Sequence, residues 1–316
     1  MGSVPFFAMT KAPVVIWRFL DGKPGHENQS AGLVQALQER VPVEVHELSA
    51  GGRLASVRYW ASCRFPPGEG LPTPDLILGA GHATHLPMLA ARRARGGRVV
   101  VMMKPSLPVR CFDLCLVPRH DAPPASDHVL VTEGVLNRMR PAAERESDLG
   151  LILIGGPSKH HGWDEAGLLA AIGELLAREP RRHWRLTTSR RTPPSCLPAL
   201  APLAKQAGDR LEVLPAEQTG RDWLPEQLSR AAVAWVTADS VSMVYEALTA
   251  GAAVGILPVP ETRPGRVSRG LRQLVDERRV VDFTVWRQGA GYPAAQPFNE
   301  AQRCAQWIVE RWLNAS

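Results

Sequence analysis

The sequence predicts an α/β protein built from two Rossmann-like domains, each with a parallel sheet. Short apolar segments alternate with helix-like segments along most of the 316 residues. Such alternation favours parallel strands that are joined by right-handed crossovers. The pattern stops at a charged segment without an apolar period, 138–150, and then restarts. A chain of this length also exceeds the usual size of one domain and suits two.

The first half contains five strand candidates and two helix candidates. A helix is predicted at Ser30–Val41, where apolar residues recur every four positions, and another at 85–96, which ends in glycine. The predicted strands are short, and most of their residues are apolar: 13–19, 43–48, 75–81, 98–104 and 114–118.

The second half repeats the alternation. It offers an amphipathic helix at Glu165–Glu179 and a long closing helix at Asn299–Asn314. Its strand-and-loop segments are 149–163, 183–194, 211–216, 231–240 and 252–259. We therefore predict an N-terminal domain at 1–145, a C-terminal domain at 146–297 and a final helix at 298–316, with 138–150 as the linker.

The charge balance narrows the class of partner. The formal net charge is +6, which favours phosphates, nucleotides or acidic lipids. A genome that prefers arginine to lysine is the alternative explanation. The sequence has no block of five basic residues and no recognisable reader module, so we expect no nucleic-acid partner.

Cysteine use and the N-terminal segment favour a cytoplasmic location. The five cysteines are scattered and odd in number, which argues against a disulfide framework. Residues 1–17 have no charged region before their apolar stretch, so we expect no signal peptide. No run of 18 apolar residues occurs, so we expect no membrane span.

The segment 52–65 mixes apolar and basic side chains. The apolar residues are Leu54, Val57, Tyr59 and Trp60, and they stand among Arg53, Arg58 and Arg64. This pattern is typical of a helix that lies on a membrane surface. The alternative is that the apolar side of the segment packs on the sheet.

Two serines and a glutamate stand where a strand ends and a helix begins. Ligands of open parallel sheets bind beyond the carboxyl ends of the strands, and a helix N-terminus offers unpaired N–H groups. Ser240 and Ser242 therefore suit a diphosphate, and Glu246 shares a helical face with Ser242 and suits a ribose. The alternative is that Asp239 or Ser240 caps the helix and Glu246 is exposed.

Two other loops that follow strands carry similar residues. In 155–163, Gly155 and Gly156 let backbone approach a ligand, or the segment is an ordinary turn with a capping serine. The donors that follow the glycines are Lys159, His160 and His161. In 187–194, Arg190 and Arg191 suit phosphate oxygens, or form a solvated pair.

His26 is the candidate base of the first half. It lies in a polar loop, 21–29, just before the first helix, where an imidazole can take a proton from an acceptor hydroxyl. The alternative is a loop or helix-capping histidine. His82 and His85 have no third ligand in view, so we expect no metal site.

Several motifs together resemble the elongated-mitochondria fission-factor family. They are DGKPGHENQSAGL (21–33), VLVTEGVLNRM (129–139), GGPSKHHGW (155–163), TTSRRTP (187–193) and TADSVSMVYEAL (237–248). The resemblance spans roughly Ile16 to Leu257. The family is in turn similar to GT-B glycosyltransferases. Segment 74–106 looks like the acceptor-domain segment of the peptidoglycan N-acetylglucosaminyltransferase, and 240–259 looks like its donor segment.

The resemblance implies two Rossmann-like domains whose sheets face across a cleft, with the last helix crossing back to the first domain. It implies a nucleotide-sugar donor on the second domain and an unknown acceptor on the first. His26 is the expected catalytic base, with Asp21 as its substitute. The expected donor-binding residues are Gly155, Gly156, Ser158, Lys159, His160, Ser189, Arg190, Arg191, Asp239, Ser240, Ser242, Met243 and Glu246.

The predicted function is sugar transfer from a nucleotide-sugar to an acceptor at or near the inner membrane. No cofactor or metal is expected, because helix termini and basic side chains stabilise the leaving diphosphate. One alternative is a nucleotide-sugar 2-epimerase, which needs carboxylates around the sugar ring. Another is an adaptor with a vestigial nucleotide site, since plant members of the family are associated with recruiting fission machinery.

Overall fold

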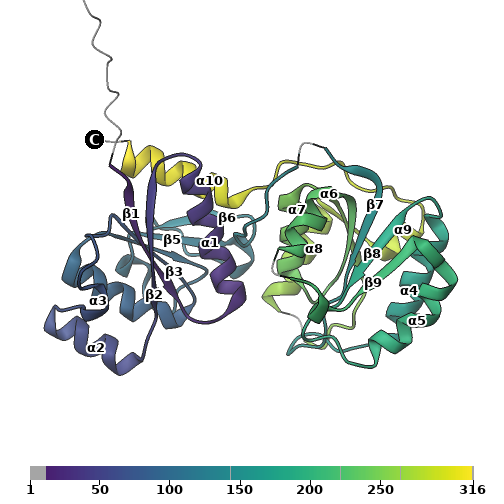
Figure 1. Ribbon diagram of the computed structural model, residues 1–316, viewed down its shortest axis with the longest axis horizontal. Helices are drawn as coiled ribbons and strands as arrows, with labels where there is room; N and C mark the ends of the chain where they lie inside the picture. Colours follow the sequence, from purple (N-terminus) through teal and green to yellow (C-terminus); the bar gives the residue numbers. More distant parts are fainter. Residues whose placement is uncertain (1–11, 143, 221, 264, 315–316) are drawn as a thin grey trace, which may run out of the picture. The chain divides into compact units, whose positions relative to one another are not determined.

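The computed structural model describes residues 12–142, 144–220, 222–263 and 265–314. Most of the N-terminal apolar stretch, for which we expected no signal peptide, lies outside them. The chain groups into two compact units (Figure 1). The first unit comprises Met1–Pro118, Pro123–Thr132 and Ala301–Ser316, and the second comprises Arg119–Ala122 and Glu133–Glu300. The domain boundaries drawn from the sequence stay predictions.

The first unit holds a six-stranded parallel sheet in the order β2-β1-β3-β4-β5-β6. Its strands are β1 (Val14–Leu20), β2 (Val43–Ser49), β3 (Leu76–Ala80), β4 (Arg98–Met102), β5 (Leu114–Pro118) and β6 (Val129–Thr132). Its helices include α1 (Pro24–Gln38), α2 (Arg53–Ser62) and α3 (His85–Arg95). The five predicted strands are confirmed, and the sequence analysis missed only the four-residue β6.

The second unit repeats the architecture with the strand order β12-β11-β10-β7-β8-β9, again all parallel. Its strands are β7 (Glu146–Leu153), β8 (His183–Thr187), β9 (Leu211–Leu214), β10 (Ala231–Thr237), β11 (Ala253–Leu257) and β12 (Val280–Asp282). Its helices are α4 (Glu165–Arg178), α5 (Cys196–Ala207), α6 (Trp223–Arg230), α7 (Val241–Ala250), α8 (Arg266–Asp276) and α9 (Phe283–Arg287).

Apolar clusters hold these helices on both faces of the second sheet. Side chains of α6, α7 and α8 pack on one face, and those of α4, α5 and α9 pack on the other (Figure 1). The two six-stranded parallel sheets, joined through helices, confirm the predicted fold class.

The predicted linker, 138–150, is wrong. β7 begins at Glu146, and its first three residues are polar because that end of the strand is exposed. Arg145 is anchored in the second unit, where its guanidinium donates to the carbonyls of Leu228 (3.2 Å), Ala231 (2.9 Å) and Ala250. A charged segment without an apolar period is typical of a linker. Here the same pattern belongs to the solvent-facing start of a central strand.

The C-terminal helix packs on the first unit, as the sequence predicted. Helix α10 (Glu300–Ile308) lies in the first unit apart from its first residue. Its Gln302 pairs with Arg40 at 2.9 Å, and its Arg303 donates to the carbonyl of Val131 at 2.6 Å. Beyond the helix, Trp312 lies under the guanidinium of Arg98 at 4.7 Å. Figure 1 shows this segment beside α1.

Candidate functional site

Three loops of the second unit meet at the buried carboxylate of Asp239. They follow β7, β8 and β10, at the carboxyl edge where parallel sheets bind ligands. The Asp239 side chain is fully buried, and its Oδ2 accepts from the Gly156 N–H at 2.9 Å and from Arg191 Nη2 at 2.7 Å. The carboxylate therefore ties the first loop to the second.

Close backbone packing explains the two glycines of the first loop. A Cβ atom on Gly155 would lie 2.2 Å from Asp239 Oδ2, and one on Gly156 would lie 2.2 Å from the Arg191 carbonyl. The Gly155 N–H donates to Thr237 Oγ1 at 2.7 Å, and Arg191 Nη1 donates to the Gly156 carbonyl at 2.6 Å. These glycines are thus required by the contacts between the loops; their role toward a donor stays a prediction.

Where the three loops meet, one oxygen of the Asp239 carboxylate makes no hydrogen bond within the described part of the chain. Asp239 Oδ1 is buried without a hydrogen-bond partner among the described residues. His161 is also buried, and burial lowers the pKa of its imidazole while the charges of Asp239 and Glu261 oppose that change. Because a carboxylate repels a diphosphate, the place of Asp239 suits a brace behind the loops better than a direct phosphate contact.

The N-terminus of α7 is not explained by capping alone. Ser240 is its N-cap residue, yet its side chain makes no capping hydrogen bond, and the carboxylate of Asp239 is engaged elsewhere. Glu246 is 9% exposed, so it is not a solvent-facing helix residue. The interpretation of these residues as an ordinary cap followed by an exposed glutamate is therefore wrong.

The first turn of α7 leaves its backbone N–H groups without intrahelical acceptors. Ser242 is exposed there, and Met243 is half-buried. The helix has ten residues, so its dipole adds partial positive charge at this point. The turn thus offers N–H donors and hydroxyl groups to an anion.

Two serines shape the loops, whereas the basic residues that follow them face solvent. Ser158 Oγ accepts from the N–H groups of His160 and His161 at 3.2 Å each. Ser189 Oγ accepts from the Arg191 N–H at 3.3 Å. The remaining predicted donor residues of these loops are exposed: Lys159, His160 and Arg190.

Two threonines that hold this edge together were not among the predicted site residues. Thr237 accepts from Gly155, and Thr192 Oγ1 donates to the Ile154 carbonyl at 3.3 Å. Thr237 is the last residue of β10, where a small polar side chain can reach the neighbouring loop. The sequence signal for Thr237 was this position of a small polar residue at the end of a predicted strand.

In the first unit, Asp21 and His26 form a pair at the carboxyl ends of β1 and β3. Their side chains meet at 2.8 Å between His26 Nδ1 and Asp21 Oδ2. The Asp21 side chain is 1% exposed and that of His26 is 19% exposed. Gly81, which follows β3 with a φ of +84°, closes over the pair, since a Cβ there would lie 2.3 Å from His26 Nδ1.

This geometry favours a different role for Asp21. A carboxylate at Nδ1 holds the tautomer that carries its proton there, which leaves Nε2 free to accept a proton. A buried carboxylate bound to that imidazole is placed to orient His26, and is poorly placed to replace it as a base. The assignment of the base itself stays a prediction.

His85 belongs to the buried part of the same edge. Its Nδ1 lies 3.1 Å from the hydroxyl of Ser106, which follows β4. Burial, with a smaller contribution from His82, lowers the pKa of His85 to about 4, so the ring is neutral at pH 7. Among the described residues, no three side chains of the metal-binding types stand together.

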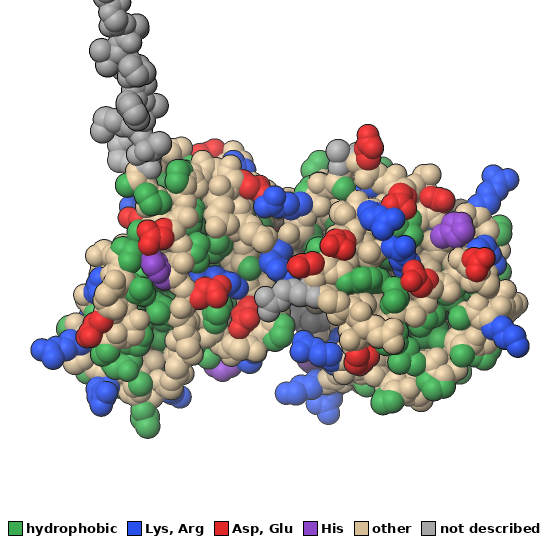
Figure 2. All heavy atoms as spheres, viewed as in Figure 1, with side chains coloured by type: hydrophobic (Ala, Val, Ile, Leu, Met, Phe, Trp, Pro, Cys, Tyr) green, Lys and Arg blue, Asp and Glu red, His purple; other side chains and the backbone are tan. Residues whose placement is uncertain are grey.

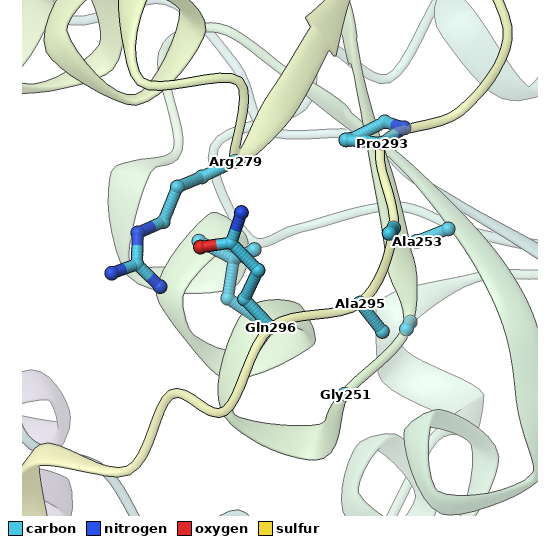
Figure 3. Close-up of a pocket in the computed structure, with 9 residues that line it drawn as sticks. Gly251, Ala253, Arg279, Pro293, Ala295 and Gln296 are labelled. Atoms are coloured by element: carbon cyan, nitrogen blue, oxygen red, sulfur yellow. The ribbon is translucent and has the colours of Figure 1, made fainter.

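A small pocket of the second unit lies away from this edge. Figure 3 shows it between Gly251, Ala253, Arg279 and the Pro293–Gln296 segment. Gly251 precedes β11, so the pocket lies at the amino ends of the strands. Ligands of parallel sheets bind at the opposite ends, and the pocket is not part of the candidate site.

Replacing Asp239 should destabilise the second unit. Asp239→Ala removes the acceptor of a buried backbone N–H together with the partner of Arg191, so we expect a loss of about 1–3 kcal/mol. Urea unfolding measures this loss, with the exposed Asp209→Ala as the matched control. Equal midpoints for the two variants would show that Asp239 is not a brace.

Replacing His85 should weaken the pH dependence of stability. Below pH 6.5 the unfolded chain binds a proton that the folded ring refuses until about pH 4, so stability falls as the pH falls through this window. The folded-state pKa predicts a loss on the order of 3 kcal/mol. In His85→Gln this loss of stability between pH 6.5 and pH 4 should vanish, whereas replacing the exposed His183 by Gln should leave it unchanged. The measurement is the free energy of unfolding at several pH values.

Comparisons with known proteins give both a family and a fold. A family model described as mitochondrial fission ELM1 matches residues 24–312. No curated protein sequence matches the chain. A putative UDP-N-acetylglucosamine 2-epimerase from Listeria monocytogenes is similar in structure, with 13% identity, a TM-score of 0.57 and coverage of 96% of this chain and 98% of that one.

Two further solved structures are similar and hold nucleotide-sugars. One is the UDP-GlcNAc 2-epimerase from Neisseria meningitidis bound to UDP-GlcNAc, with 13% identity, a TM-score of 0.56 and coverage of 95% and 99%. The other is Phytolacca americana UGT2 complexed with UDP-2fluoro-glucose and pterostilbene, with 8% identity, a TM-score of 0.53 and coverage of 94% and 90%.

Identities this low show the fold alone, which is the two-domain, Rossmann-like GT-B architecture. The family model, by contrast, matches residues 24–312, a range that contains the motifs at Gly155–Trp163 and Thr237–Leu248. The chain belongs to the mitochondrial fission ELM1 family.

Proposed function

We propose that the protein is a glycosyltransferase that takes its sugar from a nucleotide-sugar and needs no bound metal ion. The observation that carries the proposal is the start of α7, where the Ser240 side chain makes no cap and Glu246 is buried one turn further on. The nucleotide-sugars bound to the Neisseria and Phytolacca proteins support a ligand of this class for the same fold.

The donor diphosphate would bind the first turn of α7. Backbone N–H groups and the hydroxyls of Ser240 and Ser242 offer hydrogen bonds, and the helix dipole favours the negative charge. Exposed Lys159 and Arg190 are free to add charge, whereas Arg191 already pairs with Asp239. The carboxylate of Glu246 would accept hydrogen bonds from the ribose hydroxyls.

The acceptor would lose its proton to His26. Asp21 holds Nδ1, so Nε2 is the atom that takes the proton from the acceptor hydroxyl. The hydroxyl oxygen then attacks the anomeric carbon while the bond to the diphosphate breaks. Direct displacement of this kind inverts the anomeric centre. The acceptor is unidentified, and a cytoplasmic location with contact to the inner membrane remains part of the proposal.

The second candidate is a nucleotide-sugar 2-epimerase, which the names of two of the similar structures favour. The two reactions give different products from a panel of nucleotide-sugars. Transfer, or slow hydrolysis of the donor, releases nucleoside diphosphate. Epimerisation gives a sugar isomer without diphosphate accumulation, and an adaptor with a vestigial site gives neither product and no thermal shift with any nucleotide.

Replacing Glu246 should weaken nucleotide binding. Glu246→Gln keeps the volume of the side chain but removes its charge, and hydrogen bonds to charged groups lose about 1.5–3 kcal/mol in such changes. We therefore expect the Kd for a uridine diphosphate probe to rise roughly tenfold to a hundredfold, measured by calorimetry. Glu226→Gln on α6 is the matched control. An unchanged Kd in a folded Glu246→Gln variant removes the donor-site assignment.

Replacing His26 should stop turnover while leaving nucleotide binding intact. Loss of a general base lowers kcat by about 10²–10⁴-fold, so His26→Asn should release diphosphate that much more slowly at the wild-type Kd. Asp21→Asn should also slow turnover, since it disturbs the tautomer of His26. The control is His46→Gln on β2, and a His26→Asn variant as fast as this control rules out the proposed base.

A further inference from the structure

Helix α2 presents its apolar residues to solvent. Leu54 is 88% exposed, Val57 49% and Trp60 47%. Positions three apart lie near one another on a helix surface, so the three side chains form one stripe. The helix lies against α3 and buries only Ser56 fully. The alternative that the apolar side of this segment packs on the sheet holds for Tyr59, which is partly buried against the core of the first unit, and is wrong for Leu54, Val57 and Trp60.

This stripe is unusual within the described part of the chain. Only two other large apolar side chains there are exposed, Val131 at 42% and Val285 at 47%, and they lie on separate elements. Three exposed side chains present on the order of a few hundred Å². A stable protein interface needs roughly 800 Å² from each partner, so the stripe alone is too small for one.

The charged residues of α2 and α3 are all basic. Arg53 and Arg58 lie on α2, and Arg64 follows it. Arg93 of α3 stacks on the Trp60 ring at 4.5 Å and reaches Cys63 Sγ at 2.9 Å. The chain has no Asp or Glu from Leu48 to Gly68 or from Leu76 to Phe112, so neither α2 nor α3 carries an acidic side chain. In Figure 2, the end of the first unit that holds these helices shows hydrophobic and basic side chains, with an acidic side chain near them.

We propose that α2 docks on the surface of an anionic lipid bilayer. Leu54, Val57 and Trp60 enter the boundary between headgroups and acyl chains, where tryptophan is favoured. The arginines bind lipid phosphates, and their attraction adds to the burial of the apolar stripe. No described helix is long and apolar enough to cross a bilayer, so this mode of contact needs only the surface. The proposal does not depend on sugar transfer.

Vesicle flotation of the full-length chain tests the proposal. We expect binding to vesicles of phosphatidylcholine mixed with phosphatidylglycerol, and binding at least about tenfold weaker to phosphatidylcholine alone. Leu54→Glu should weaken binding to the mixed vesicles by about tenfold or more, and Arg58→Glu should weaken it too. Val285→Glu is the matched control, because Val285 is as exposed as Val57 but lies on α9 of the second unit.

Quenching of tryptophan fluorescence measures membrane contact directly and needs no charged variant. Brominated lipid in the mixed vesicles should quench the fluorescence of the wild-type protein more than that of Trp60→Phe. No binding of the wild type to mixed vesicles, or equal binding of Leu54→Glu and Val285→Glu, overturns the proposal. So does self-association of the wild type that Leu54→Glu abolishes in analytical ultracentrifugation, since a second copy would then cover the stripe.

Discussion

The candidate nucleotide-sugar site, at the carboxyl edge of the second sheet, depends on one buried charge. The carboxylate of Asp239 is fully enclosed, and a buried charge is tolerated only when it is paired and hydrogen-bonded. Its two donors, the Gly156 N–H and the Arg191 guanidinium, come from the loops after β7 and β8. Both loops are thereby fixed to the loop that starts α7. Neither oxygen of Asp239 bonds to the first turn of α7, since Oδ2 accepts from the other two loops and Oδ1 has no partner among the described residues, so that turn keeps its N–H donors for a ligand.

The fold could be predicted because parallel strands with both faces covered must be short and apolar, and nearly every such segment became a strand. The errors have local causes. α5 and α6 were missed because prolines interrupt them, at Pro202 and Pro225. β12 has only three residues, too few to show a period. The start of β7 was mistaken for a linker because Arg145 contacts the carbonyls of residues up to 105 positions away, which no local pattern reveals.

The place of the site was predictable, and its contacts were not. The rule that ligands bind at the carboxyl ends of parallel strands leads to Gly155, Arg191 and Ser240 from the sequence alone. That Arg191 faces a carboxylate 48 positions further on depends on the tertiary structure, as does the burial of Glu246. The same holds for Asp21, which the sequence offers as a second base and the structure makes the partner of His26.

The Asp21–His26 pair bears on the choice between an enzyme and an adaptor. A carboxylate with 1% of its side chain exposed is a poor device for stability, since apolar residues of similar size serve a core better. Here it faces an imidazole in the first turn of α1, which the sequence placed in a loop before that helix, at the sheet edge where ligands bind, and Gly81 leaves just enough space for both. An adaptor has no use for an oriented imidazole, whereas proton transfer requires one. The cost of burying Asp21 is therefore better explained by chemistry at His26 than by packing.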